Sequence, residues 1–156
     1  EYRPPNMAPI GAMALFGGAA ILDRRLALAI PLAAMLISDL FIGFDASRVW
    51  IYGSIALITL LGRTLQHSRR QPLAIVGGSL AASLLFFVVT NFGVWLMSGW
   101  YTHTPGELIR CYTLAIPFFR NTVGGDLLFC GLLFGGLAWL ESREAGVATV
   151  TIESDH

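Results

Sequence analysis

The sequence predicts an all-α protein, a polytopic bundle of transmembrane helices, because long apolar stretches alternate with short joints that hold nearly every charge. Residues 26–44 contain one ionisable side chain, Asp39, and residues 72–99 contain none. A helix needs about 20 apolar residues to cross a hydrocarbon core that is about 30 Å thick. Both stretches therefore have the length and the composition of a membrane span.

The composition agrees with a membrane protein of one domain. Hydrophobic residues make up 55% of the chain and charged residues 13%, whereas about 25% of the residues in a soluble domain are charged. The 156 residues suffice for one bundle, which we expect at residues 1–140, followed by a polar cytoplasmic tail at residues 141–156. The formal net charge is zero, so we expect no binding of nucleic acid.

Five spans are expected, at residues 7–22, 26–44, 49–65, 72–95 and 121–140. Pro72 suits the start of the fourth span, since proline is common at the first position of a helix. Residues 108–119 are apolar but too few to cross a bilayer, so we expect them to form a re-entrant or interfacial segment. The polar residues 141–156 are expected to be poorly ordered.

The arginines predict the orientation of these spans. Short joints on the cytoplasmic side of membrane proteins are enriched in basic residues. The side reached after the first, third and fifth spans carries Arg24, Arg25, Arg63, Arg69, Arg70 and Arg143, and the other side carries Arg3, Arg48, Arg110 and Arg120. We therefore expect a multi-pass protein of the bacterial inner membrane with a cytoplasmic carboxy terminus. Because Glu1 then lies outside and is not an initiator methionine, we also expect an upstream helix, which would make six spans.

Five polar or aromatic residues are expected at membrane depth, near the outer ends of their spans. Carboxylates inside a membrane are costly and normally face a cavity or a partner. If the spans converge as predicted, these residues line an outward-facing polar cavity that binds a small molecule. The candidate substrate-binding residues are Asp39, Asn91, Trp95, Asn121 and Asp126.

Each candidate also has a structural interpretation. Asp39 and Asp126 could pair with Arg48, Arg110 or Arg120, or cap helix ends. Asn91 could bridge two helices, and Trp95 could anchor the chain at the membrane surface.

The sequence contains no signature of catalysis. It has no glycine-rich phosphate loop with a lysine, no H-E-x-x-H pattern and no paired-cysteine metal pattern. Nothing places a nucleophile beside a base. We therefore expect neither enzymatic activity nor a cofactor, and an intramembrane enzyme that uses Asp39 and Asp126 is the third alternative.

Several short motifs together resemble a bacterial family of uncharacterised membrane proteins of the transport type. They are the segment 3–10 leading into 14–19, Pro31-Leu32, Ser38-Asp39-Leu40, the segment 90–95, Cys111-Tyr112, the segment 116–119, Asn121-Thr122 and Gly125-Asp126. The resemblance covers about residues 3–136. Members of that family usually carry one more hydrophobic helix ahead of the Arg-x-Pro segment.

That family is similar in layout to the substrate-binding S components of energy-coupling factor transporters. Those six-helix proteins hold a vitamin or a metal near the outer face and work with a transmembrane coupling protein that two ATPases drive. The resemblance implies an uptake component without its own ATPase, for an unknown small molecule. The alternative is a structural accessory subunit that packs its glycine and alanine faces into a larger membrane complex.

Overall fold

A computed structural model of the chain describes residues 9–43 and 48–154, with side chains up to residue 144 except that of residue 42. This part of the chain is entirely helical, which confirms the all-α prediction. Its five helices are α1 (Ile10–Ala20), α2 (Arg24–Ile42), α3 (Arg48–Thr64), α4 (Pro72–Met97) and α5 (Pro105–Ser154).

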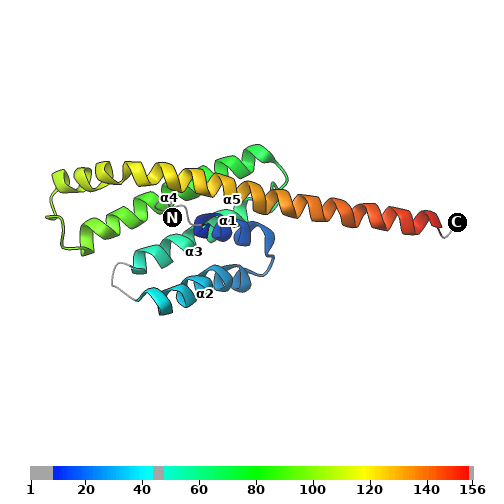
Figure 1. Cartoon of the computed structure of the whole chain (residues 1–156), viewed down its shortest axis with the longest axis horizontal. Helices are drawn as coiled ribbons and strands as arrows, with labels where there is room; N and C mark the ends of the chain where they lie inside the picture. The colour runs from blue at the N-terminus through cyan, green and yellow to red at the C-terminus, as the bar shows by residue number, and fades with distance from the viewer. Residues whose placement is uncertain (1–8, 44–47, 155–156) are drawn as a thin grey trace, which may run out of the picture.

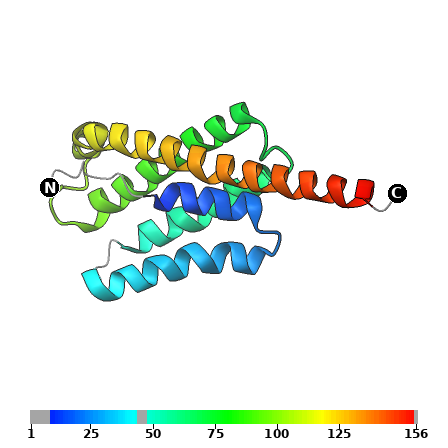
Figure 2. The same ribbon diagram turned by 45° about the vertical axis from the view of Figure 1, so that its right-hand side comes forward.

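The short helix α1 occupies the centre of the bundle. It packs against all four other helices, whereas α2 packs only against α1 and α3 within the described part of the chain. Figures 1 and 2 show α2 at one edge, α4 and α5 side by side at the other, and α5 continuing well past the end of the remaining helices. The bundle is therefore built around an element of 11 residues.

Local sequence explains where the helices begin and end. The Asp23 side chain accepts hydrogen bonds from the backbone N–H groups of Arg25 and Leu26, at 2.7 and 3.2 Å, which is the normal role of an N-cap aspartate. Pro72 occupies the first turn of α4, as predicted. Gly43 follows α2 with a φ of +101°, a conformation that favours glycine because it lacks a Cβ atom.

The expectation of a separate re-entrant segment at residues 108–119 is wrong. These residues are the first turns of α5, which runs through Pro117 and Arg120 as one helix. Proline in a helix interior removes one backbone hydrogen bond and crowds the preceding turn, which bends a helix without necessarily ending it. Figure 2 shows the bend, since the first turns of α5 are seen nearly end-on while the rest crosses the view. The same helix continues through residues 141–154, for which the sequence predicted poor order.

Two helices are long and apolar enough to cross a membrane, namely α4 and the part Pro105–Glu144 of α5. The other three are less clear as spans. Helix α2 begins with two arginines and contains Asp39, α3 has 17 residues, and α1 has 11. The structure thus supports two of the five expected spans by length and composition, and the full number stays a prediction.

The exposed surface and the buried polar groups differ from those of a soluble protein, although the core also contains apolar side chains such as Leu15, Ile55 and Ile58. Large apolar side chains face outward, and Phe41, Leu73 and Leu22 are 87%, 85% and 81% exposed. The interior holds many small residues together with buried polar groups, which are Asp39, Ser54, Thr59, Ser79, Ser83 and Asp126. Soluble monomers rarely expose large contiguous apolar surfaces or bury carboxylates. This surface is suited to an apolar surrounding.

Glycines allow α1 and α3 to touch backbone to backbone. A Cβ atom on Gly18 would overlap the carbonyl oxygen of Thr59, and one on Gly62 would overlap that of Leu15. Neither carbonyl can move without distorting its helix. Small residues that bring helix backbones together are the usual contact in membrane bundles.

Gly62→Ala should therefore lower the free energy of unfolding by about 1–3 kcal/mol, the usual cost of overpacking. Gly53→Ala is the matched control, since Gly53 lies on the same helix and a Cβ atom there meets nothing within 4 Å. That substitution should stabilise by about 0.4–1 kcal/mol. Thermal unfolding of the purified variants in detergent measures both, and equal effects would contradict the close crossing.

Candidate functional site

Asp126 joins three helices at the centre of the bundle. Its side chain comes from α5 and is 2% exposed. One carboxylate oxygen, Oδ2, accepts a hydrogen bond from the hydroxyl of Ser83 on α4 at 2.7 Å. The other, Oδ1, accepts one from the backbone N–H of Ala12 on α1 at 3.2 Å.

The Asp126 carboxylate acts as the N-terminal cap of α1. The residue before α1, Pro9, makes no capping hydrogen bond with its side chain. The first N–H groups of a helix lack partners within the helix, and its N-terminus favours negative charge. Asp126 satisfies both requirements from another helix. It can approach because residue 11 is glycine, since a Cβ atom there would lie 2.7 Å from Oδ1.

A cavity of about 300 Å³ lies beside the bend of α5, between α4 and α5. Pro117 lies inside α5 at this level, and proline in a helix interior is a usual cause of a bend. The cavity, which we call the bend cavity, is lined by Ile51, Phe86, Phe87, Thr90, Asn91, Val94, Ala115, Phe118, Phe119 and Thr122. Aromatic and aliphatic side chains thus form most of its wall, with two hydroxyls and one amide.

A second cavity of about 200 Å³ lies next to the bend cavity and reaches Asp126. The two cavities share Ile51, Phe86 and Thr122, and the second is also lined by Ile10, Gly11, Met35 and Asp126. Asn91 and Asp126, both predicted site residues, therefore line two adjoining spaces.

The side chain of Asn91 retains an acceptor for a ligand. Its Nδ2 atom donates to the carbonyl oxygen of Phe87, one turn earlier, at 2.8 Å. Its Oδ1 atom accepts no hydrogen bond from the described part of the chain. The hydroxyls of Thr90 and Thr122 bond the carbonyls of Phe86 and Phe118, at 2.7 and 3.2 Å, and can still accept a hydrogen bond from a ligand.

The other predicted residues lie elsewhere. Trp95 donates its indole N–H to the carbonyl of Thr102 at 3.2 Å and packs edge-on against His103, so it braces the joint between α4 and α5. Asn121 is half-buried and is not among the residues that line either cavity.

Asp39 lies at the contact of α2 with α3. It is 1% exposed, pairs with the guanidinium of Arg48 and accepts a hydrogen bond from the Tyr52 hydroxyl at 2.8 Å. Both partners belong to α3, so this carboxylate fastens α2 to the bundle. It is not part of the lining of either cavity.

Sequence reasoning missed Gly11, Ser83 and Thr122. Gly11 and Ser83 act only through Asp126, which is more than 40 residues away from each along the chain. No local pattern reveals such a partner. Thr122 could have been found, since it lies one turn before Asp126 on the same helical face.

Residues 2–148 match a family of unknown function, DUF6580, and the chain belongs to that family. No curated protein and no solved structure matches it. Among the described residues, no group of three or more His, Cys, Asp or Glu side chains could hold a metal ion.

Asp126→Ala should lower the free energy of unfolding by about 1–3 kcal/mol, the cost of leaving buried hydrogen-bonding groups without a partner. Asp126→Asn should cost less, because its amide oxygen can still accept from Ala12. The control is Glu107→Ala, which removes an ion pair with the exposed Arg110 and should change stability by less than about 1 kcal/mol. Equal stability of the Asp126→Ala variant and the wild type, by thermal unfolding, would rule out the capping role.

Proposed function

We propose that this DUF6580 member is a membrane-embedded component that binds a small molecule in the bend cavity and takes part in its uptake. The supporting observation is the cavity itself, about 300 Å³ between α4 and α5. Small-molecule sites are concave and mostly apolar, with a few polar groups that fix orientation. The bend cavity has this composition.

The outward-facing apolar side chains support the placement in a membrane. Two helices meet the length requirement, and α2 and α3 are close to it, with 19 and 17 residues. Central α1 would be surrounded by the others and would need little lipid contact. On this proposal the chain crosses the bacterial inner membrane several times.

The joints lie at two opposite ends of the bundle, as the proposed orientation requires. Gln66 donates to the carbonyls of Gly18 and Ile21, and Arg70 pairs with Glu141, so the joints after α1 and α3 meet α5 at one end. The joint 98–104 lies at the other (Figure 1). We place the first end, with its many arginines, in the cytoplasm. The bend cavity then lies toward the outer side.

The lining favours a ligand with an apolar or aromatic body and at least one hydrogen-bond donor. Phe86, Phe87 and Phe119 supply aromatic surface, and the rings of Phe87 and Phe119 pack at a tilt of 44° with their centroids 4.7 Å apart. Asn91 Oδ1 supplies the acceptor. Both Asp126 oxygens already accept hydrogen bonds from the protein, so the amide is the better recognition group.

We propose that the energy for uptake comes from outside this chain. The sequence carries no phosphate-binding loop, and its motifs resemble a family whose layout is that of energy-coupling factor S components. A transmembrane coupling protein with ATPases would then be the partner. The chain would be non-catalytic.

A structural accessory subunit of a larger membrane complex is the second candidate. The observation that favours it is the length of α5, which extends past the ends of the other four helices that the structure describes (Figures 1 and 2). A projecting helix is available to pack against another protein.

Filling the bend cavity should abolish binding of the small molecule. Ala115 lines the cavity, so Ala115→Phe should displace a ligand, and Asn91→Ala should weaken binding by about tenfold through loss of one hydrogen bond to a desolvated partner. Ala81→Phe is the control, because Ala81 is exposed on the same helix as Asn91.

The measurement is a thermal-shift screen with water-soluble vitamins and related small heterocycles, since a bound ligand raises the unfolding midpoint. We expect a compound that stabilises the wild type and Ala81→Phe but neither cavity variant. A compound that stabilises all four proteins equally would place the site elsewhere. If none stabilises the wild type and the cavity variants only disperse a larger complex, the subunit candidate is correct.

The orientation is tested by labelling single cysteines in intact cells with an impermeant thiol reagent. In a background without Cys111 and Cys130, Thr102→Cys should react and Gln71→Cys should react only after the cells are opened. Both positions are exposed in joints at opposite ends. The reverse pattern would invert the topology, and labelling of both in intact cells would exclude a span between them.

A further inference from the structure

We propose that the cytoplasmic end of the bundle holds an anionic phospholipid, with its phosphate on Arg69 and Arg70 and one acyl chain in a groove between α4 and α5. This inference rests on the placement in a membrane given above, but not on uptake. The groove is separate from the bend cavity and encloses about 300 Å³.

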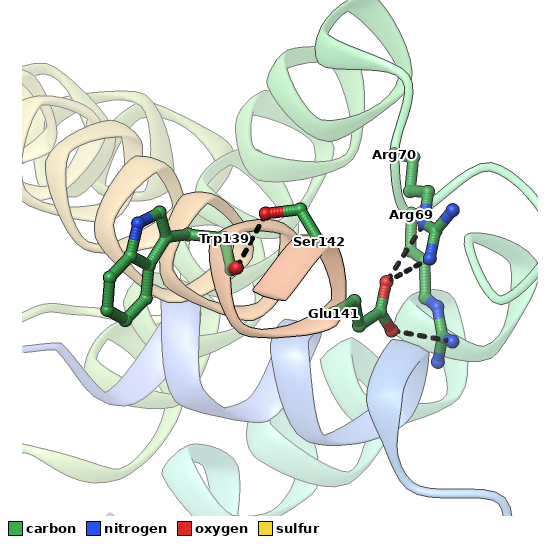
Figure 3. A network of polar contacts seen from close by, with 5 residues as sticks. All are labelled: Arg69, Arg70, Trp139, Glu141 and Ser142. Carbon is green, nitrogen blue, oxygen red and sulfur yellow. Dashed lines mark hydrogen bonds and ion pairs between the residues drawn. The ribbon is translucent and has the colours of Figure 1, made fainter. Parts of the chain in front are cut away.

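The mouth of the groove carries more positive than negative charge. Arg69 contacts Oε1 of Glu141 at 3.0 Å, and Arg70 contacts Oε2 at 2.9 and 2.6 Å (Figure 3). One carboxylate thus faces two guanidinium groups. Each guanidinium has five N–H donors, so these three contacts leave donors on both arginines for a phosphate, the group that arginine binds best in pairs.

The body of the groove is apolar. Below the arginines, most of the lining is apolar, with Ile75 and Val76 on α4 and with Leu127, Cys130, Phe134 and Ala138 on α5, and Ser79 contributes one hydroxyl. Leu127 and Ala138 are 11 residues apart on α5, or roughly 16 Å at 1.5 Å per residue. That length is about half of a 30 Å hydrocarbon core, which is the depth of one lipid leaflet.

An exposed tryptophan on the other side of α5 indicates the level of the membrane surface. Trp139 is two residues before Glu141 and points away from it (Figure 3). It is 55% exposed and has the guanidinium of Arg143 4.4 Å from its ring. Tryptophan and arginine gather at the level of the lipid headgroups. Basic pockets between helices at the cytoplasmic surface suit anionic headgroups. The phosphate of the lipid would thus contact arginines, and its acyl chain would contact apolar side chains.

Two glycines on α5 can be replaced by larger residues to fill the groove. Gly131 and Gly135 line it, and a Cβ atom on either meets nothing within 4 Å. Gly136 is equally open but does not line the groove. A leucine at position 131 or 135 should therefore occupy the groove without disturbing the fold, and a leucine at 136 should not.

The experiment is native mass spectrometry of the purified full chain with phosphatidylglycerol or phosphatidylcholine of identical acyl chains. The wild type should retain phosphatidylglycerol about tenfold better than phosphatidylcholine. Arg69→Gln with Arg70→Gln should remove that preference. Arg24→Gln with Arg25→Gln makes the same charge change at exposed positions outside the groove and should keep it.

Gly131→Leu and Gly135→Leu should reduce retention of both lipids, whereas Gly136→Leu should not. Equal retention of the two lipids by the wild type overturns the inference. The inference is also wrong if both double arginine variants lose the preference for phosphatidylglycerol to the same extent, or if Gly131→Leu and Gly135→Leu retain as much lipid as the wild type. None of these substitutions touches the bend cavity, so lipid loss with compound binding intact, or the converse, separates this inference from the uptake proposal.

Discussion

The capping of α1 by Asp126 is the interaction on which the rest of the bundle depends. A helix of 11 residues is too short to be stable alone, and α1 is held by its neighbours at both ends. Asp126 bonds its first turn, and the glycine crossing with α3 holds its last turn. The buried carboxylate is compensated by a helix N-terminus and by Ser83 rather than by a cation.

The residue that holds the helices together, Asp126, is distinct from the groups that we propose to bind ligands. Asp126 lies between the bend cavity, toward one end of α4 and α5, and the arginine-headed groove, toward the other. The bend at Pro117 leaves the first space open, while glycines at 131 and 135 leave the second open. Helices α4 and α5 thus form two different sites. The bend cavity offers an amide acceptor for a small molecule that donates a hydrogen bond, and the groove offers guanidinium donors for the phosphate of a lipid.

The sequence predicted the helical class and the start of α4, because long apolar runs and an initial proline are local signals. It also predicted that Asn91 and Asp126 lie near each other, and in the structure they line two neighbouring cavities. It could not identify partners that lie far away in the sequence, such as Gly11 and Ser83 for Asp126. Asp39 was a candidate for the site with pairing to Arg48 as its structural alternative, and the structure contains that pair together with a hydrogen bond from Tyr52. Residues 108–119 were expected to form a separate segment, but α5 runs through Pro117 as one helix, because proline can bend a helix without ending it.

The most direct test of the Asp126 junction, which joins α5 to both α1 and α4, is a double-mutant cycle between Asp126 and Ser83. The free energies of unfolding of the wild type, Asp126→Ala, Ser83→Ala and the double variant would be measured in mixed detergent micelles. Because the two side chains share a buried hydrogen bond of 2.7 Å, the account predicts a coupling energy of about 1 kcal/mol or more. Losses that add to within about 0.3–0.5 kcal/mol would show that Asp126 does not join α4 to α5, and would contradict the account.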